Sequence, residues 1–240
     1  MFDMHCHVDL IDPMNRFCAT AAMLDISILA MTTTPRAYHA ETNMLRNYQS
    51  VYVALGLHPQ LVSERKQELT IFDRYVASSR FIGEVGLDFS KRFYSSKEDQ
   101  IIAFEHIIQA CVHSKTISVH SVFSDKYVLD ILEKYRTTEQ NNCILHWYSG
   151  SSKQLDRALE MGCYFSVNEQ MLKSANGLKI IHGIPVERMV LESDAPFVGS
   201  INTAELLKGS LTRAQEGVSK IKGPESKDTL AHTSRILLGI

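Results

Sequence analysis

The sequence lacks most of the features that mark secreted or membrane-bound proteins. Its five cysteines are odd in number and scattered through 240 residues, and no two of them have the CxxC spacing. This pattern predicts reduced thiols in a cytoplasmic protein rather than a disulfide framework. The chain has no apolar run of membrane-spanning length. It also does not begin with a basic region followed by an apolar stretch, so we expect neither a membrane anchor nor a signal peptide.

The chain also lacks an excess of positive charge. Its formal net charge is −2 and its isoelectric point is near 6.5. Proteins that hold nucleic acid through many phosphates are usually basic. If this protein binds a polyanion, the positive charge must be local, and bound metal ions could supply it. Glycine-rich loops with the GxGxxG spacing are absent, so no dinucleotide site is expected.

Short apolar runs alternate with amphipathic segments along the whole chain. The predicted strands are residues 1–8, 26–33, 51–57, 81–87, 116–120, 143–146, 163–167 and 188–192. The predicted helices are residues 12–25, 35–48, 64–78, 97–114, 125–135, 152–161, 170–181, 203–220 and 225–238. Such alternation favours a parallel sheet with crossover helices. Eight units fit a single (β/α)8 TIM barrel, an α/β fold of about 250 residues, across residues 1–240. A doubly wound open sheet is the alternative.

Residues that can bind metals stand at or near the ends of these strands. His5 and His7 are two positions apart in a strand, so their side chains lie on the same face. The full set of candidate ligands is His5, His7, Glu84, His120, His146 and Asp194. Active sites of (β/α)8 barrels lie at the carboxyl ends of the strands. We therefore predict that these six side chains form one metal site.

Four imidazoles and two carboxylates are more ligands than one tetrahedral ion needs. We predict two divalent ions about 3.5–4 Å apart, with Glu84 as the shared carboxylate. Zinc, magnesium and manganese all remain open as candidates. The expected division is His5, His7 and Asp194 at one ion and His120 and His146 at the other. Such a pair would activate water for hydrolysis of phosphodiesters, amides or related esters, so Glu84 and Asp194 are the candidate catalytic residues.

Five motifs, in order, resemble those of the TatD-like metal-dependent deoxyribonucleases. They are Asp3-Met-His5-Cys-His7, Gly56-Leu-His58-Pro59, Gly83-Glu84-Val-Gly86-Leu87-Asp88, His146-Trp-Tyr-Ser149-Gly150 and Leu191-Glu-Ser-Asp194-Ala-Pro196. The resemblance covers residue 2 to about residue 197. It implies that the six candidate residues are metal ligands. It also implies that the substrate is DNA, single-stranded or at an end, cleaved at its phosphodiester bonds.

Two further stretches resemble one subgroup of that family. They are Met31-Thr-Thr-Thr-Pro35-Arg36 and Gly56-Leu-His-Pro-Gln-Leu61. The subgroup is the QatD-type, whose members are encoded in multi-gene antiphage defence systems. This resemblance implies an assembly with other antiphage-system proteins.

The chain departs from the family pattern at two arginine positions. Many members carry arginine two residues after the histidine of the fifth strand, where this chain has Val122. The loop after Pro196 also lacks arginine, and the next one is Arg213. A guanidinium fork binds phosphate well, so its loss predicts a shift in substrate choice or in activity. Cations that could compensate are Arg36, Lys91 and Arg92.

Several residues beside these motifs are candidates for substrate contact. They are His58, Asp88, Tyr148, Ser149 and Arg36. His58 could instead cap the following turn, and Asp88 could hold a ligating histidine by a hydrogen bond. Tyr148 could stack on a base. Ser149 begins a segment whose amides could bind phosphate or could simply cap the next helix.

Two other functions remain open from the sequence. One is an amidohydrolase acting on a small amide or ester, although many such enzymes bridge their ions with a modified lysine where this chain has Glu84. The other is a non-catalytic scaffold in a defence complex, which the missing arginines favour and the six retained ligands oppose. The pattern does not distinguish DNA from RNA or one strand polarity from the other.

Overall fold

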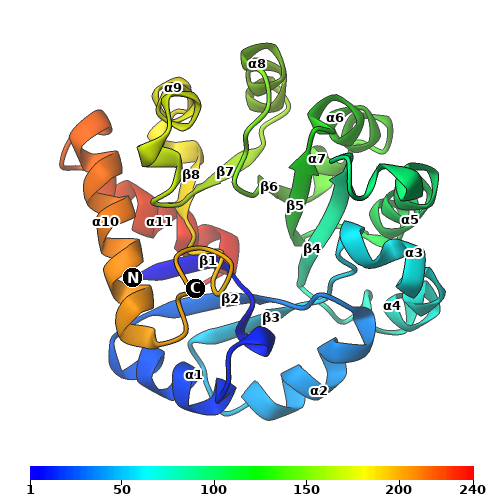
Figure 1. The fold of residues 1–240 in the computed structure, drawn as a ribbon, viewed down its shortest axis with the longest axis horizontal. Coiled ribbons are helices and arrows are strands. Elements are labelled where there is room, and N and C mark those ends of the chain that lie inside the picture. The colour runs from blue at the N-terminus through cyan, green and yellow to red at the C-terminus, as the bar shows by residue number, and fades with distance from the viewer. The chain divides into compact units, whose positions relative to one another are not determined.

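The computed structural model describes all of residues 1–240. Strands and helices alternate along the chain (Figure 1). The strands are β1 (Phe2–Cys6), β2 (Ser27–Met31), β3 (Val51–Ala54), β4 (Phe81–Asp88), β5 (Thr116–Val122), β6 (Asn142–Leu145), β7 (Tyr164–Val167) and β8 (Met189–Leu191). All eight predicted strands are therefore confirmed, with ends that differ by a few residues.

The helices also follow the predicted order. They are α1 (Met14–Met23), α2 (Pro35–Leu45), α3 (Val62–Arg65), α4 (Leu69–Tyr75), α5 (Lys97–Ala110), α6 (Asp125–Lys134), α7 (Thr137–Gln140), α8 (Ser152–Glu160), α9 (Ala175–Gly183), α10 (Ala204–Lys222) and α11 (Ser226–Leu238). The sequence did not predict α7, because a single turn is too short to show a helical periodicity.

The helix predicted over residues 64–78 is broken in the structure. A 3-10 turn at Lys66–Glu68 separates α3 from α4. The carboxylate of Glu68 is buried and accepts a hydrogen bond at 3.1 Å from the backbone N–H of Arg36, in the first turn of α2. Early helix N–H groups have no partner within their own helix. The break therefore occurs where Glu68 accepts a hydrogen bond from an otherwise unpaired backbone N–H at the start of α2.

Backbone contacts divide the chain into two units. The first contains residues 1–31, 41–53 and 165–240, and the second contains residues 32–40 and 54–164. In the first unit, β1 pairs with β2 and β7 pairs with β8, both in parallel. The segment after β8 bonds to β1, through Asp194 N–H to His5 O at 3.0 Å and His7 N–H to Ala195 O at 2.8 Å. Residues from the two ends of the chain thus lie side by side.

In the second unit, the strands β4, β5 and β6 pair in parallel in chain order. The register between β4 and β5 shifts between Ile82 and Val85, where β4 holds one extra residue. Such a bulge redirects the side chains beside it, and Glu84 is one of them. Further along, a Cβ atom on Gly86 would lie 2.1 Å from the carbonyl oxygen of His120. Glycine therefore permits the close approach of β4 to the part of β5 that carries His120.

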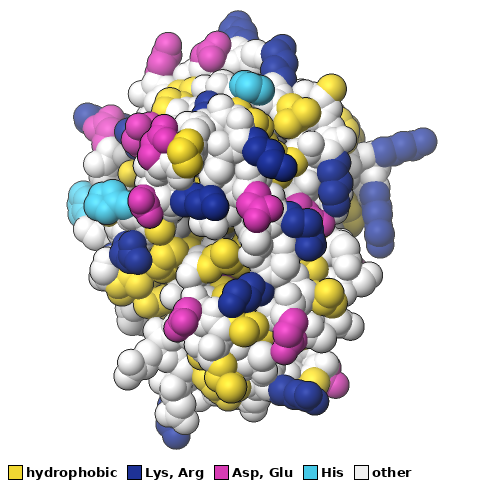
Figure 2. Space-filling view, turned by 90° about the vertical axis from the view of Figure 1, so that its left-hand side faces the viewer, with side chains coloured by type: hydrophobic (Ala, Val, Ile, Leu, Met, Phe, Trp, Pro, Cys, Tyr) yellow, Lys and Arg dark blue, Asp and Glu magenta, His cyan; other side chains and the backbone are white.

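The helices and one face of the molecule can be compared with the expectations on membrane binding and charge. None of the helices combines the length and the apolar character that crossing a bilayer requires. Basic, acidic and hydrophobic side chains are interspersed over the face drawn in Figure 2. This mixture agrees with the net charge of −2.

Candidate functional site

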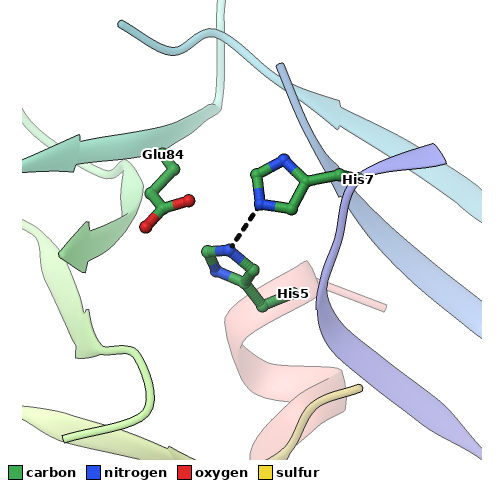
Figure 3. A group of neighbouring side chains, drawn as sticks. All are labelled: His5, His7 and Glu84. Carbon is green, nitrogen blue, oxygen red and sulfur yellow. Dashed lines mark hydrogen bonds between the residues drawn. The ribbon is translucent and has the colours of Figure 1, made fainter. Parts of the chain in front are cut away.

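In the first unit, two histidines and one aspartate form a compact group. The Nε2 atoms of His5 and His7 are 3.3 Å apart, and Figure 3 shows these two rings turned toward each other. Asp194 Oδ1 lies 3.8 Å from the first Nε2 and 3.7 Å from the second. All three residues are buried. The two ends of the chain thus bring together three of the predicted ligands.

Asp194 owes its position to backbone contacts rather than to a regular element. Its φ is +51°, a left-handed conformation that non-glycine residues seldom adopt. Its N–H donates to His5 O, and its carbonyl accepts from Phe197 N–H. These bonds hold the carboxylate beside β1. Strain of this kind is typical of functional sites.

Asp3 makes hydrogen bonds to the segments that carry this group. Its carboxylate accepts hydrogen bonds from Ser193 Oγ at 2.6 Å, Ser193 N–H at 2.9 Å and His5 N–H at 3.2 Å. Burial raises the pKa of Asp3 to about 7, although those hydrogen bonds act in the opposite direction. Asp3 therefore acts as a positioning residue for the segments that carry His5 and Asp194.

Glu192 is a second buried carboxylate that the sequence reasoning did not single out. It accepts a hydrogen bond from Asn168 Nδ2 at 2.9 Å and a short one from Ser166 Oγ. Both partners lie on or just after β7. These contacts tie the segment after β8 to the end of β7.

In the second unit, three histidines surround Glu84. Its Oε1 lies 2.5 Å from His120 Nδ1 and 3.1 Å from His146 Nε2, and its Oε2 lies 3.3 Å from His58 Nε2. Glu84 is buried on β4, next to the bulge (Figure 3). The structure therefore brings Glu84, His120 and His146 together and adds His58.

His58 has two contacts at once. Its Nδ1 accepts a hydrogen bond from Gln60 N–H at 3.2 Å, so its Nε2 carries the proton and faces Glu84. The turn-capping contact considered from sequence is present. It also fixes the ring for its contact with the carboxylate.

Asp88 orients His120. Its Oδ2 lies 3.3 Å from His120 Nε2 and accepts from Gln60 Nε2 at 2.7 Å, while its Oδ1 accepts from Ser90 N–H at 2.9 Å. Burial raises the pKa of Asp88, but the hydrogen bonds from His120, Ser90 and Gln60 outweigh it and bring the pKa well below its usual range. An ionised carboxylate behind a histidine is the arrangement that orients metal ligands.

The charge balance around His120 is also suited to a cation. Burial lowers the pKa of His120, but the charge of Glu84 and the hydrogen bond to Asp88 raise it more, and the net shift is upward. The same carboxylates that favour a proton on this ring would favour a metal ion beside it.

The donor set of the first unit fits a divalent ion. The three atoms His5 Nε2, His7 Nε2 and Asp194 Oδ1 are 3.3, 3.7 and 3.8 Å from one another. A point equidistant from them lies about 2.1 Å from each, within the range of about 2.0–2.2 Å for zinc bound to imidazole or carboxylate. Within the second unit, His58, Glu84 and His120 also offer ligand atoms within 4.8 Å of one another. Imidazole with carboxylate suits zinc and manganese among other ions.

The remaining candidates for substrate contact lie in different surroundings. Tyr148 is 1% exposed, and its hydroxyl contacts Ser151 O at 3.2 Å. A ring so buried has no free face, so the stacking role expected of Tyr148 does not fit. Ser149 is exposed, and the side chain of Arg36 is 71% exposed, so both remain available to a ligand. The cap of α8 is Ser151, which accepts from Gln154 N–H.

Some contributors could have been found in the sequence and others could not. Asp3 is two positions before His5 in a strand, so the alternation that paired His5 with His7 also places Asp3 on their face. Phe197 packs edge-on against His7 at 5.2 Å, and nothing local indicates that contact. The partners of Glu192 are likewise visible only in three dimensions.

Comparison with known proteins identifies relatives over the whole chain. The family model described as TatD related DNase matches residues 2–238. "Deoxyribonuclease Tat-D" of Schizosaccharomyces pombe is 28% identical over 169 residues, which are 65% of this chain and 54% of that protein. "3'-5' ssDNA/RNA exonuclease TatD" of Klebsiella pneumoniae is 25% identical over 190 residues, which are 75% of this chain and 70% of that protein.

A solved structure of a TatD homolog has the same fold as this chain. The TatD homolog YJJV from Escherichia coli k12 superimposes with a TM-score of 0.86 at 21% identity, covering 100% of this chain and 98% of that one. Such neighbours are TIM barrels. Together with the eight parallel strands, they confirm the predicted (β/α)8 class over the open doubly wound sheet.

Proposed function

We propose, from the premise that the chain belongs to the family of TatD-related DNases, that it removes nucleotides from the ends of single-stranded DNA with the help of two divalent metal ions. Family membership makes it a metal-dependent hydrolase acting on ester bonds. The observation that carries the proposal is the triangle of His5 Nε2, His7 Nε2 and Asp194 Oδ1, whose dimensions fit one ion.

The fold supports the proposal of two ions. In a (β/α)8 barrel the carboxyl ends of all strands face one end of the barrel. His5, His7 and Asp194 would hold one ion there, and His120 and His146 would hold the other. Glu84 is proposed as the ligand common to both, since its carboxylate has two oxygens and already contacts His120 and His146. Zinc, magnesium and manganese are the candidate ions.

The protein's own groups prepare the reaction. Bound divalent ions would lower the pKa of a water molecule and stabilise charge on the phosphate and the leaving oxygen. Asp88 holds the ring of His120, and Asp3 holds the segment that precedes Asp194. Asp194 is the proposed acceptor of a proton from the attacking water, and its backbone bonds to His5 and Phe197 would hold the carboxylate beside β1.

The choice of substrate rests on the relatives and on charge. The Klebsiella relative is named as an exonuclease of single-stranded DNA and RNA. This chain has a net charge of −2 and no arginine at position 122, so it is poorly suited to gripping a duplex through many phosphates. A strand end needs fewer such contacts. Exposed Arg36 and Ser149 are the proposed substrate contacts.

A nuclease assay with defined strands tests this proposal. The purified protein, supplied with zinc, magnesium or manganese, should shorten single-stranded DNA labelled at the 5' or 3' end, and the labelled end reveals the polarity. Glu84→Gln and Asp194→Asn should lose at least a hundredfold in rate, while Glu64→Gln on the surface should not. RNA and duplex DNA serve as competing substrates.

The same assay separates the rival functions. Bound metal without cleavage of any nucleic acid, but with hydrolysis of small amides or esters, would favour an amidohydrolase. Absence of bound metal after reconstitution would favour the non-catalytic scaffold. Either result would overturn the nuclease proposal.

The missing arginine provides a separate test. We expect Val122→Arg to tighten substrate binding or increase the rate, because the guanidinium would pair with a phosphate. No gain in either quantity would show that this chain does not need the arginine that many family members carry.

The cellular setting is also a proposal. All five cysteines are buried and none forms a disulfide with another, which supports the proposal of a reducing compartment such as the cytoplasm. The resemblance of residues 31–36 and 56–61 to the QatD-type subgroup supports a role in antiphage defence with partner proteins. Phage plating on cells that carry the complete gene set, with either wild-type protein or Glu84→Gln, tests this role. Equal plating with both proteins would count against it.

A further inference from the structure

Phe123 is exposed at a place where nothing in the fold explains a large apolar side chain. It is 81% exposed and lies three residues after His120, directly beyond β5. Its φ is +52°, which is rare for a bulky residue. Because the ring is largely exposed, its packing within the fold does not offset the energetic cost of this backbone conformation. Strain of this kind is concentrated at functional sites.

The backbone holds Phe123 in this outward position. Phe89 N–H donates to Val122 O at 2.9 Å, and Ser124 Oγ donates to Leu87 O at 2.7 Å. Ser124 also accepts from Val128 N–H at the start of α6. The residues on both sides of Phe123 are therefore tied to the β4 end and to α6, and these bonds fix the direction in which the Cα–Cβ bond of Phe123 leaves the backbone.

An aromatic and cationic cluster lies on the loop after β4 and on the first turns of α5 and α6. Lys97 Nζ lies 4.3 Å from the ring centroid of Tyr127 and 5.1 Å from that of Phe89, and it donates to Tyr127 Oη at 3.1 Å. The rings of Phe89 and Tyr127 meet edge to face at 5.2 Å. Tyr127 is one turn of α6 away from Phe123 in the sequence. The bond from Phe89 N–H to Val122 O joins this cluster to the residue before Phe123.

The nearby charges favour an anionic partner. Lys91 and Arg92, in the loop after β4, are exposed. The nearest acid in sequence, Asp125, already accepts from Ser151 N–H at 3.1 Å. A protein partner would need a larger apolar area than Phe123 and the exposed part of Tyr127. An exposed flat ring, with exposed cations on the neighbouring loop after β4, fits an unpaired base and its phosphates.

We propose that Phe123 is a stacking platform for one unpaired nucleobase of the substrate strand, with Lys91 and Arg92 pairing with the adjoining phosphates. The inference rests on the proposed function and specifies its substrate as a strand that carries bases. It also explains why this chain can have Val122 where many family members have arginine. Stacking by Phe123 would bind the substrate strand in place of the contact between that guanidinium and a phosphate.

Strands with and without bases test the proposal directly. Binding is measured by fluorescence anisotropy with the metal chelated, using labelled oligothymidylate and an abasic strand of equal length. Wild-type protein should bind oligothymidylate more tightly than the abasic strand. Phe123→Ala should weaken oligothymidylate binding by about tenfold while leaving abasic binding unchanged. Phe123→Trp should preserve the preference, and Ile102→Ala, another exposed apolar residue, should behave as wild type.

A second variant guards against misfolding. Phe123→Gly should be at least as stable as the wild type in thermal unfolding, because glycine tolerates positive φ, and it should also lose the preference for bases. In the cleavage assay with metal, Phe123→Ala should raise KM and change kcat by less than about twofold. Lys91→Gln with Arg92→Gln should weaken binding of both strands and flatten its dependence on salt.

The outcomes of the two proposals are distinguishable. If Phe123→Ala retains the wild-type ratio of the two affinities, the stacking role is overturned even where cleavage is normal. If no strand is cleaved with any metal, the nuclease proposal fails. The binding ratio still tests Phe123 in that case, because it is measured without turnover.

Discussion

At the scale of the residue, Glu41 in α2 has an unusual environment. Its carboxyl group is 3% exposed, and neither oxygen has a hydrogen-bond partner. Burial, and next the charge of Asp9, raise the pKa of Glu41 to about 9. Because the native pKa exceeds the unfolded one, its contribution is fully present below about pH 4.5 and is lost as the pH rises toward 9.

We therefore expect Glu41→Gln to change how stability depends on pH. The wild type should lose up to about 1.4 kcal/mol of unfolding free energy per pH unit through this group between pH 5 and 8. The variant should lack that slope, so its stability relative to the wild type should increase by up to about 4 kcal/mol between pH 5 and pH 8. Urea unfolding across this range measures it, with Glu64→Gln as the exposed control. Parallel curves for wild type and variant would contradict the assignment.

A second residue-scale prediction concerns Asp88. Asp88→Asn would turn an acceptor for both His120 and Gln60 into a group that also donates, so the ring of His120 would lose its fixed orientation. Loss of such a carboxylate typically costs 10–100-fold in metal affinity. Titration calorimetry with manganese or zinc measures the change, and Asp73→Asn on the surface is the control. An unchanged affinity would mean that Asp88 does not position His120.

At the scale of the element, Gln100 organises the loop between β4 and α5. It is fully buried and accepts from Asp88 N–H at 2.7 Å. It also donates to the carbonyls of Asp88 and Phe93, at 3.0 and 3.1 Å. One side chain on α5 thus holds the backbone that carries Asp88, Lys91 and Arg92.

Gln100→Leu should loosen this loop. The variant would leave several buried backbone groups without partners, at a cost of about 2–4 kcal/mol in unfolding free energy. Nuclease activity should fall as well, because Asp88 would be less well placed. Chemical unfolding and the cleavage assay measure both effects. Gln109→Leu, which removes one exposed hydrogen bond to Tyr135, should change stability by less than about 1 kcal/mol.

The elements also show where sequence reasoning succeeds. The runs ending near His7, Asp88, His120 and His146 were recognisable as strands because their apolar periodicity is local. The bulge beside Glu84 and the break at Lys66–Glu68 were not recognisable. Each is a response to a neighbouring segment, namely β5 in one case and the first turn of α2 in the other.

At the scale of the whole molecule, metal binding should be coupled to stability. An ion that binds only the folded chain stabilises it by about 2.7 kcal/mol at one hundred times its dissociation constant. Scanning calorimetry should therefore show a higher Tm with zinc or manganese and a return to the lower value with chelator. His5→Ala and His120→Ala should each reduce the shift. An equal Tm with metal, without metal and with chelator would contradict the proposed metal centre.

The sequence by itself determined the order of strands and helices, the number of barrel units and the types of ligand that follow the strands. It did so because apolar periodicity and motif spacing depend only on neighbouring residues. Tertiary structure decided that Asp3 holds Ser193, that Tyr148 turns inward and that Phe123 faces solvent. The surroundings of a side chain are set by segments far away in the chain, here up to 190 residues apart, and only their packing brings those segments together.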